Sequence, residues 1–409
     1  MSEPRLAEVP VSAGRGAFAA GAATLAALYV GNNVPSALYA LLRATFGFSA
    51  LVQTLLYAVA VAVIVPGLLI AGPLSDAVGR RPLMLAGLAA FFAGDVVFAL
   101  APGAGWLFVA RILQGLGMGA GAAAAQAMLN DSAGQDARGQ RRAATTATAC
   151  VTFGLALGPL AGGLLAQYGP LPRHLPFVVH AAAVAVVAAL VARTPPAIRT
   201  PRPARPQRRR LPRLGVPPVV RRTFLVAGAS SFLAWAVLGM FSAVVPSLVS
   251  STLGSANLAI AAAALALMIA TSGFVQFGAR KVAPIAAQAS GLVVLAAGLA
   301  LLVLSGEAGL PWLVVPAMLG TGTGHGLVFT GALAELTVVT PPAERGAVIG
   351  TYYVVSYVGL GGPVIGVGLL SIAHGLPAAT VLVAAVIGAC CLVLAPLVFL
   401  EARRQAGPR

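Results

Sequence analysis

Two charged residues lie inside stretches of sequence that are otherwise apolar, and their spacing brings them to the same level. Asp95 occurs in LMLAGLAAFFAGDVVFALA and Arg111 in WLFVARILQGLG, and Gly103 marks the centre of the turn between them. Each residue is eight positions from Gly103, which corresponds to about 12 Å of helix at about 1.5 Å per residue. In an antiparallel helical hairpin the two side chains can therefore approach each other and pair.

An Asp95–Arg111 pair would have a definite chemistry. The arginine keeps the aspartate ionised, because a nearby cation favours the charged form of a carboxylate. If the arginine is drawn away, or a substrate competes for it, the aspartate can take up a proton. The pair is therefore a candidate proton switch, and the alternative is a fixed ion pair that joins two helices.

Two further ionisable residues lie within apolar stretches, where a charge is costly and a functional role is the default hypothesis. His325, in TGTGHGLVF, could carry a proton, because histidine titrates near neutral pH. The alternative is a histidine that hydrogen-bonds to a neighbouring helix. Glu335 is another candidate proton carrier, and its alternative is pairing with Arg345 or reaching the membrane surface.

Amide and aromatic side chains are the candidates for a substrate-binding surface. Asn32 and Asn33 adjoin Pro35, which should bend the helix that carries them, so they could form a cavity wall or hydrogen-bond between helices. The further candidates are Tyr29, Gln53, Tyr57, Gln114, Gln126, Trp235, Met240, Gln276, Tyr353 and Tyr357. For the aromatic residues, packing or a place at the membrane interface is the alternative.

The composition places these residues in membrane-spanning helices. Of the 409 residues, 59% are hydrophobic and 9% are charged, whereas a soluble domain carries about 25% charged residues. A stretch of roughly 20 apolar residues can span a bilayer, and it must be helical because lipid offers no water to an open backbone. The sequence predicts an all-α membrane protein with twelve spans, over residues 17–42, 50–71, 83–101, 105–129, 143–166, 174–193, 222–250, 256–278, 284–305, 311–337, 346–370 and 376–400.

A region rich in proline and arginine divides the chain into two halves. The expected parts are a cytoplasmic N-terminal segment (1–16), a six-helix bundle (17–193), a basic linker (194–221), a second six-helix bundle (222–400) and a tail (401–409). Alternate loops collect the basic residues, which places both termini in the cytoplasm by the positive-inside rule. The net charge of +16 is therefore expected to set membrane topology rather than to bind nucleic acid.

Glycine patterns suggest that the two halves are related. GLGMGAG (115–121) and GTGTGHG (320–326) are offset by 205 residues, and GPLAG (158–162) and GPVIG (362–366) by 204. Two patterns at nearly one offset indicate a parallel duplication, with a pseudo-twofold axis along the membrane normal.

Three motifs together resemble one known family. The segment GPLSDAVGRRP carries Gly72, Asp76, Gly79, Arg80 and Arg81, and it resembles the loop between the second and third helices of the major facilitator superfamily. RILQG (111–115) resembles the fourth-helix motif of that family, and GLALGPLAGG (154–163) resembles the fifth-helix motif of its drug:proton antiporter branch. Gly72 is expected to end the second helix and Gly79 to bend the chain further, because glycine tolerates positive φ.

The resemblance implies a gate at the cytoplasmic surface. Asp76 would be stabilised by the helix N-terminus near Gly346, and Arg80 could pair with Asp131. Such a latch would hold the two halves together in the outward-open state, and the alternative is a loop that only sets topology. The matching loop of the second half, QFGARKVAP (276–284), has basic residues but no acid, so a gate there should be weaker.

The fifth-helix motif is expected to shape the exchange step and limit leakage, as the resemblance implies. Its small residues should allow close contact with a helix of the other half, and a simple packing surface is the alternative. These residues are Gly154, Gly158, Pro159, Gly162 and Gly163.

The sequence predicts a monomeric secondary transporter of the bacterial inner membrane. The resemblance of its fifth-helix motif to the antiporter branch implies that it exports amphipathic drugs or metabolites in exchange for protons. It contains no phosphate-binding loop for ATP, no metal-ligand cluster and no arrangement that suggests an enzyme or a cofactor site. The alternatives are uptake or facilitated transport of a sugar or other polar metabolite, and a membrane receptor or lipid-handling protein that transports nothing.

Overall fold

The computed structural model describes residues 11–134, 136–194, 214–252, 254, 257–279 and 281–405, and every regular element in these ranges is a helix. Of the expected N-terminal segment, residues 1–10 lie outside the description, and so do residues 195–213 of the expected linker.

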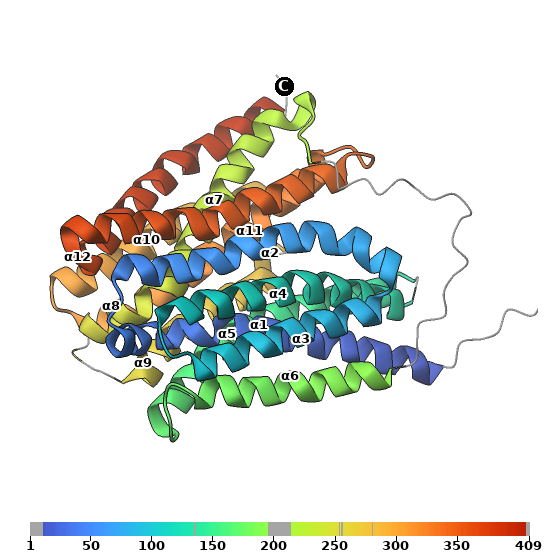
Figure 1. Cartoon of the computed structure of the whole chain (residues 1–409). Coiled ribbons are helices and arrows are strands. Elements are labelled where there is room, and N and C mark those ends of the chain that lie inside the picture. Colours follow the sequence, from blue (N-terminus) through green and yellow to red (C-terminus); the bar gives the residue numbers. More distant parts are fainter. Residues whose placement is uncertain are drawn as a thin grey trace, which may run out of the picture.

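The described chain forms twelve α-helices (Figure 1). The first half contains α1 Val11–Phe46, α2 Ala50–Val78, α3 Arg80–Leu100, α4 Ala104–Ser132, α5 Ala137–Tyr168 and α6 Leu175–Arg193. The second half contains α7 Arg221–Ala243, α8 Val245–Thr252, α9 Leu258–Ala279, α10 Pro284–Glu307, α11 Val314–Val339 and α12 Arg345–Gln405, with short 3₁₀ helices η1 Pro218–Val220 and η2 Pro311–Leu313 before α7 and α11.

These helices make twelve membrane crossings, as the sequence predicts. Within the described residues, eleven helices are long and apolar enough to cross a bilayer. The last of them, α12, contains two crossings, because Gly375 adopts a non-helical φ of 76° in its middle. The predicted seventh span is one crossing built from α7 and α8, which break at Val244 just before Pro246, a residue that has no N–H for the helix ladder.

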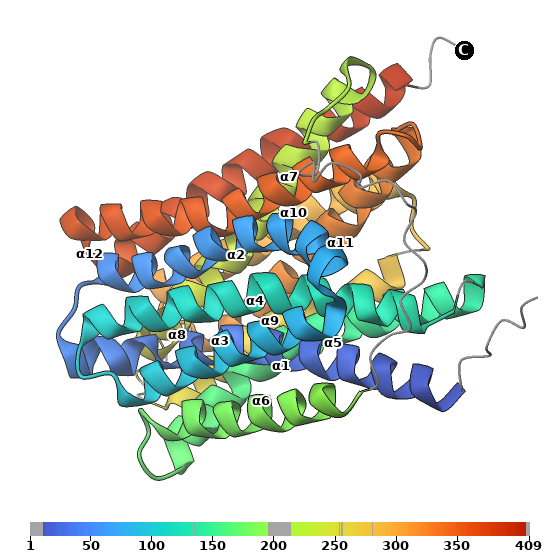
Figure 2. The same ribbon diagram turned by 45° about the vertical axis from the view of Figure 1, so that its right-hand side comes forward.

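The crossings form two bundles of six, with α1–α6 in one and α7–α12 in the other (Figures 1 and 2). We call the end that carries the α2–α3 and α4–α5 turns the terminal face, because the described chain begins and ends there with α1 and α12. The opposite end, which carries the α1–α2, α3–α4 and α5–α6 turns, is the distal face.

The alternating glycines of α4 allow neighbouring backbones to touch on two sides. A Cβ atom on Gly117 would lie 2.5 Å from the carbonyl oxygen of Gly87 in α3, and one on Gly119 would lie 2.7 Å from the Cα of Gly67 in α2. Residues two apart on a helix point in nearly opposite directions. Gly117 therefore packs against α3, and Gly119 packs against α2 on the opposite side of α4. Small residues at such contacts let membrane helices approach closely.

The second half repeats this device in a different register. In α11, a Cβ on Gly324 would lie 2.5 Å from the backbone nitrogen of Leu295 in α10, and one on Gly322 would lie 2.4 Å from the carbonyl oxygen of Met268 in α9. An offset of 205 would match Gly117, which faces the third crossing of its half, with Gly322, which faces the second. Glycines that are 205 residues apart therefore do not occupy equivalent packing positions in the two halves. A pattern with glycine at every second position can be aligned with another such pattern at several offsets, so the sequence could not identify the equivalent glycines.

The second glycine match is wrong in the same sense. A Cβ on Gly158 would lie 2.3 Å from the carbonyl oxygen of Val30 in α1, whereas Cβ atoms on Gly362 and Gly366 would meet no described atom within 4 Å. The contact with the first crossing of the second half is made by Gly359, next to Phe232 of α7.

We expect Gly158→Leu to destabilise the protein and Gly366→Leu to be tolerated. The first substitution drives a side chain into the α1 backbone, and overpacking costs typically about 1–3 kcal/mol. The second places the same side chain where nothing described lies within 4 Å. Thermal unfolding of the two purified variants, followed by size-exclusion chromatography, measures the difference, and equal melting temperatures would contradict the packing described here.

Candidate functional site

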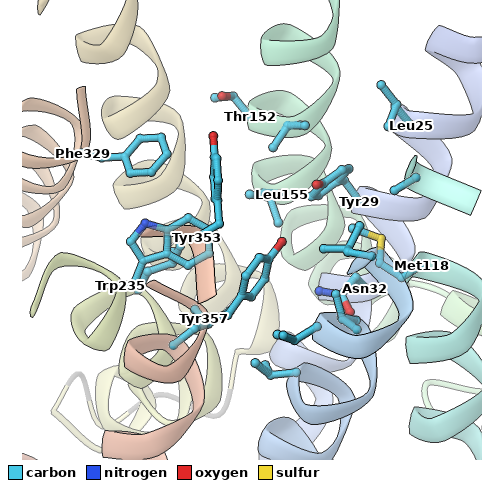
Figure 3. Close-up of a pocket in the computed structure, with 18 of the residues that line it drawn as sticks. Leu25, Tyr29, Asn32, Met118, Thr152, Leu155, Trp235, Phe329, Tyr353 and Tyr357 are labelled. Atoms are coloured by element: carbon cyan, nitrogen blue, oxygen red, sulfur yellow. The ribbon is translucent and has the colours of Figure 1, made fainter. Parts of the chain in front are cut away.

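A large cavity lies between the two halves (Figure 3). Its volume is about 680 Å³, and its wall combines residues of α1, α2, α4 and α5 with residues of α7, α9, α11 and α12. Among the residues that the structure describes, no aspartate, glutamate, lysine or arginine lines it. The wall is thus apolar and aromatic, with a few amides and hydroxyl groups, which is typical of a site for a small molecule.

The structure places most of the predicted cavity residues in this wall. They are Tyr29, Asn32, Asn33, Tyr57, Gln126, Trp235, Gln276, Tyr353 and Tyr357, together with His325. Three predicted residues do not line it: Gln53, Gln114 and Met240 are fully buried in helix contacts. Depth along the helix is readable from sequence, but the direction of each side chain depends on helix rotation, and this explains the three errors.

The wall contributed by the second half is an aromatic cluster. The ring of Trp235 lies 5.0 Å from that of Tyr357 and 5.7 Å from that of Phe329, measured between centroids. Figure 3 shows these rings, with Tyr353, facing Tyr29 and Asn32 across the cavity. His325 stacks on Phe329 at 6.3 Å, and its Nδ1 lies 2.7 Å from the Ser272 hydroxyl.

Three polar atoms of this wall have no hydrogen-bond partner among the described residues. They are Nε1 of Trp235, Nε2 of His325 and Oδ1 of Asn32, and each is shielded from solvent. Buried polar groups in proteins are normally paired. These atoms are therefore groups that a bound molecule can satisfy once the surrounding side chains adjust.

The cavity reaches toward the terminal face. Gln126 lies near the end of α4, Ala144 and Thr148 near the start of α5, and Gly350 near the start of α12, and all four line it. Figure 2 shows α7, α11 and α12 diverging from α4 and α5 toward this end.

The distal face is closed by hydrogen bonds between the halves. Gln53 of α2 donates to the carbonyl oxygen of Ala243 in α7 at 2.7 Å. Gln167 of α5 accepts from the backbone nitrogen of Leu258 in α9 at 2.9 Å. Gln53, predicted to line the cavity, therefore belongs to this closure.

Asp95 and Arg111 lie at the same level, as predicted, but they do not form a direct ion pair. Gln114 stands between them: its Nε2 donates to Asp95 Oδ1 at 2.9 Å, and its Oε1 accepts from Arg111 Nη1 at 3.2 Å. Both charged side chains are 1% exposed. The hydroxyl of Tyr39 accepts from Nε and Nη2 of Arg111 at 3.1 and 2.6 Å.

The direct partner of Asp95 is His180, which the sequence reasoning missed. His180 Nδ1 lies 2.6 Å from Asp95 Oδ2, and its Nε2 lies 3.0 Å from the carbonyl oxygen of Ala27 in α1. A signal was present, since Asp95 is five residues before the end of α3 and His180 five after the start of α6. The depth comparison used for Asp95 and Arg111 therefore also applies to this pair.

Arg80 is the centre of an ionic cluster at the terminal face. Its guanidinium lies 2.5 Å from Asp76 and 3.1 Å from Asp131, and it also contacts Ser75. The predicted Arg80–Asp131 pair is thus present. Arg81 donates to the carbonyl oxygen of Ala192 at the end of α6.

Gly72 has a different place from the one predicted. It lies within α2, and its carbonyl oxygen accepts from the Ser75 hydroxyl at 2.8 Å. The helix continues to Val78 and ends at Gly79, which has a φ of 109°. Glycine is tolerated here inside a helix, and only Gly79 needs the conformational freedom of glycine.

The fifth-helix glycines mostly contact their own half, contrary to the expectation. Cβ atoms on Gly154, Gly158 and Gly162 would collide with Tyr29, Val30 and Val34 of α1. Gly163 alone among the motif glycines faces the other half, where a Cβ would lie 2.4 Å from that of Ala262 in α9. Pro159 lies inside α5. Glu335, the remaining candidate, is buried in α11 and does not line the cavity.

Comparison with known proteins decides the family. The family model described as Major Facilitator Superfamily matches residues 20–362. The chain belongs to the major facilitator superfamily. Membership of this superfamily identifies the chain as a membrane transporter.

Relatives of this facilitator include drug-resistance proteins and transporters of other cargo. It is 36% identical over 126 residues to the class G tetracycline resistance protein of Vibrio anguillarum, over 31% of this chain and 30% of that protein. The matched regions cover less than a third of the length of the curated relatives.

Two solved structures share the fold over nearly the whole chain. A bacterial homologue of the human lysosomal transporter Spinster, inward-facing and occupied, superposes with a TM-score of 0.74 at 16% identity, covering 94% of this chain and 96% of that one. A D-xylose–proton symporter superposes with a TM-score of 0.67 at 16% identity, covering 93% and 96%.

We expect Arg111→Met to lower the stability of the protein markedly. The variant keeps the length of the side chain but removes a buried cation and its hydrogen bonds to Tyr39, Gln114 and the backbone of Asn32. Removing one partner from a buried ionic group typically costs about 3–5 kcal/mol. Thermal unfolding measures the loss, and the exposed Arg138→Met is the matched control; equal melting temperatures would show that the network contributes nothing to stability.

Proposed function

We propose that this facilitator exports amphipathic small molecules in exchange for protons by alternating access. The observation that carries the proposal is a cavity between the halves whose described wall has no acidic or basic side chain except His325, reaching one face and closed by interhelical hydrogen bonds at the other. Without a fixed charge in its wall, the cavity suits neutral or weakly charged lipophilic cargo. The similarity to a tetracycline resistance protein supports export of such compounds.

Charge placement supports an orientation with both termini in the cytoplasm, and similarity to bacterial proteins supports a bacterial inner-membrane location. The terminal face carries Arg80, Arg81 and the basic α4–α5 region, together with Arg403 and Arg404 at the end of α12. The distal face carries Arg43 and Arg173. By the positive-inside rule the terminal face is cytoplasmic, so the structure represents a state open to the cytoplasm.

The proton site in this proposal lies behind the cavity wall, at Asp95. The Asp95 side chain is 1% exposed. Burying an ionisable group inside a membrane protein costs free energy, so its presence suggests a functional role. His325 is the second candidate, because it lines the cavity directly. Glu335 does not line the cavity in this state and is the third candidate proton carrier.

Transport into proteoliposomes under an imposed pH gradient tests the proposal. We expect tetracycline to accumulate when the gradient is applied and Asp95→Asn to abolish this accumulation. The exposed Glu344→Gln is the matched carboxylate control and should transport like the parent protein.

The other functions give different results in the same vesicles. Gradient-independent counterflow of D-xylose would favour facilitated transport of a sugar. This alternative is supported by the amide side chains in the cavity wall, which are those of Asn32, Asn33, Gln126 and Gln276. Movement of neither compound would contradict transport of these classes and favour a receptor or lipid-handling protein.

We also propose that the ionic cluster around Arg80 is a latch of the outward-open state. In the present state Asp76 pairs with Arg80 of its own half, and its side chain is 68% exposed. When the cytoplasmic side closes, the N-terminus of α12 can approach Asp76 and stabilise it by about 0.3–1 kcal/mol or somewhat more if partly buried.

We expect Asp76→Asn to shift the protein toward the cytoplasm-open state. Spin labels at V78C and V338C, exposed positions at the ends of α2 and α11 in opposite halves, report their separation by electron double resonance. The variant should show a larger population at the long distance. It loses the contact with the α12 N-terminus in the closed arrangement, whereas the exposed Asp76–Arg80 pair that it loses in the open arrangement contributes little to stability. Asp136→Asn is the control, since asparagine also caps the α5 N-terminus; an unchanged distribution for Asp76→Asn would contradict the latch.

A further inference from the structure

Two side chains hold the cavity-lining part of α1 from behind by its backbone. His180 of α6 contacts the carbonyl oxygen of Ala27 at 3.0 Å, and Arg111 of α4 donates to that of Asn32 at 3.1 Å. Between these points lies Tyr29, which faces the cavity. Gly31 provides the room, because a Cβ there would lie 2.1 Å from the His180 ring.

Asp95 orients both of these side chains. Its Oδ2 contacts His180 directly, and its Oδ1 accepts from Gln114, whose other end accepts from Arg111. The ionisable groups around Asp95 come from every helix that surrounds it: Arg111 from α4, His180 from α6 and, through Arg111, Tyr39 from α1. Asp95 is the carboxyl group that joins His180 to Gln114.

The contacts of His180 fix the number of protons on the pair. A carbonyl oxygen can only accept, so Nε2 of His180 carries a hydrogen toward Ala27. The 2.6 Å contact between Nδ1 and Oδ2 needs a second hydrogen, held either by Nδ1 or by the carboxyl group. The pair is therefore an imidazolium with a carboxylate, or a neutral imidazole with a carboxylic acid, and both forms hold the same two protons.

Loss of one proton makes the two contacts incompatible. A neutral imidazole beside a carboxylate has one N–H, which can serve either Asp95 or Ala27. The pair then passes from net charge zero to minus one, with Arg111 still linked through Gln114. The ring nitrogen that has lost its hydrogen would then point its lone pair at an oxygen atom, either of Asp95 or of Ala27, and the two repel each other. His180 must therefore break its contact with Asp95 in α3 or with Ala27 in α1.

We propose that the Asp95–His180 pair carries the exchanged proton, and that its release loosens α1 at the cavity wall. The inference rests on the proposed function and deepens it by adding His180 to the proton site and by linking that site to the cargo site through α1. The proton passes to water, and α1 becomes free to adapt around cargo. Since linkage is reciprocal, bound cargo that needs the loosened α1 favours release of the proton, which is the condition for antiport.

His180 acts as a positioning and proton-carrying residue that does not line the cavity, and this separates it from the residues that contact cargo. We expect His180→Gln in proteoliposomes to lose gradient-driven tetracycline accumulation, to the level of protein-free vesicles. Tetracycline counterflow without a gradient should persist. His374→Gln, in the α12 bend outside the cavity and the buried network, should behave as the parent protein.

Nuclear magnetic resonance of the ¹⁵N-histidine-labelled full chain in nanodiscs tests the proton count without any cargo. His180 is assigned by its absence in His180→Gln, or by elimination with the other three histidines replaced if that variant does not fold. We expect two protonated ring nitrogens, or one together with an infrared band of a protonated carboxyl group. One proton should leave the pair as the pH rises, and Asp95→Asn should abolish the imidazolium form and the carboxyl band.

The outcomes separate the two proposals. If the parent protein shows no gradient-driven flux while the pair holds and loses its proton as described, proton-driven export is wrong, and the pair remains a proton site that holds α1 without a role in exchange. If flux is present and His180→Gln keeps it in full, or if His180 stays a neutral tautomer beside a carboxylate at all pH values, the inference is overturned.

Discussion

The fold depends on a constraint imposed by lipid. Hydrocarbon is as apolar as leucine, so helices in a bilayer gain little by hiding apolar side chains from it, and they associate through close packing and interhelical hydrogen bonds. Both devices are prominent in this facilitator. Glycines on opposite sides of α4 and α11 bring three backbones together in each half, and polar side chains join helices where the backbones stand further apart.

The same constraint explains where the charges lie. The buried ionic group, Asp95, His180 and Arg111, is enclosed by α1, α3, α4 and α6 within one half, where hydrogen bonds satisfy its members. In the described part of the chain, the cavity wall has no acidic residue, lysine or arginine. A lipophilic cargo therefore need not displace an ion, and the charged group acts on the cavity through the backbone of α1.

The number of crossings, the division into halves and the depth of each polar residue were predictable, because apolar length and helical rise determine them. Rotation about the helix axis was not, since mean hydropathy is high on every side of these helices. That is why Gln53 and Gln114 were placed in the cavity, and why the fifth-helix glycines were assigned to the other half when Gly158 and Gly162 contact α1. The alternating glycines of α4 and α11 could not show which glycine of one half is equivalent to which glycine of the other.

Different chemistry holds the two ends of the molecule, amide hydrogen bonds between the halves at the distal face and an ionic cluster within the first half at the terminal face, and this has a consequence for how salt acts on them. The distal closure uses neutral amide bonds, Gln53 to Ala243 and Gln167 to Leu258, which dissolved ions barely affect. The cluster at Arg80 is made of exposed charges, whose attraction is screened within a Debye length of about 8 Å at physiological ionic strength. A change in ionic strength at the terminal face would therefore act on the Arg80 cluster, whereas the same change at the distal face would leave the amide hydrogen bonds almost unaffected.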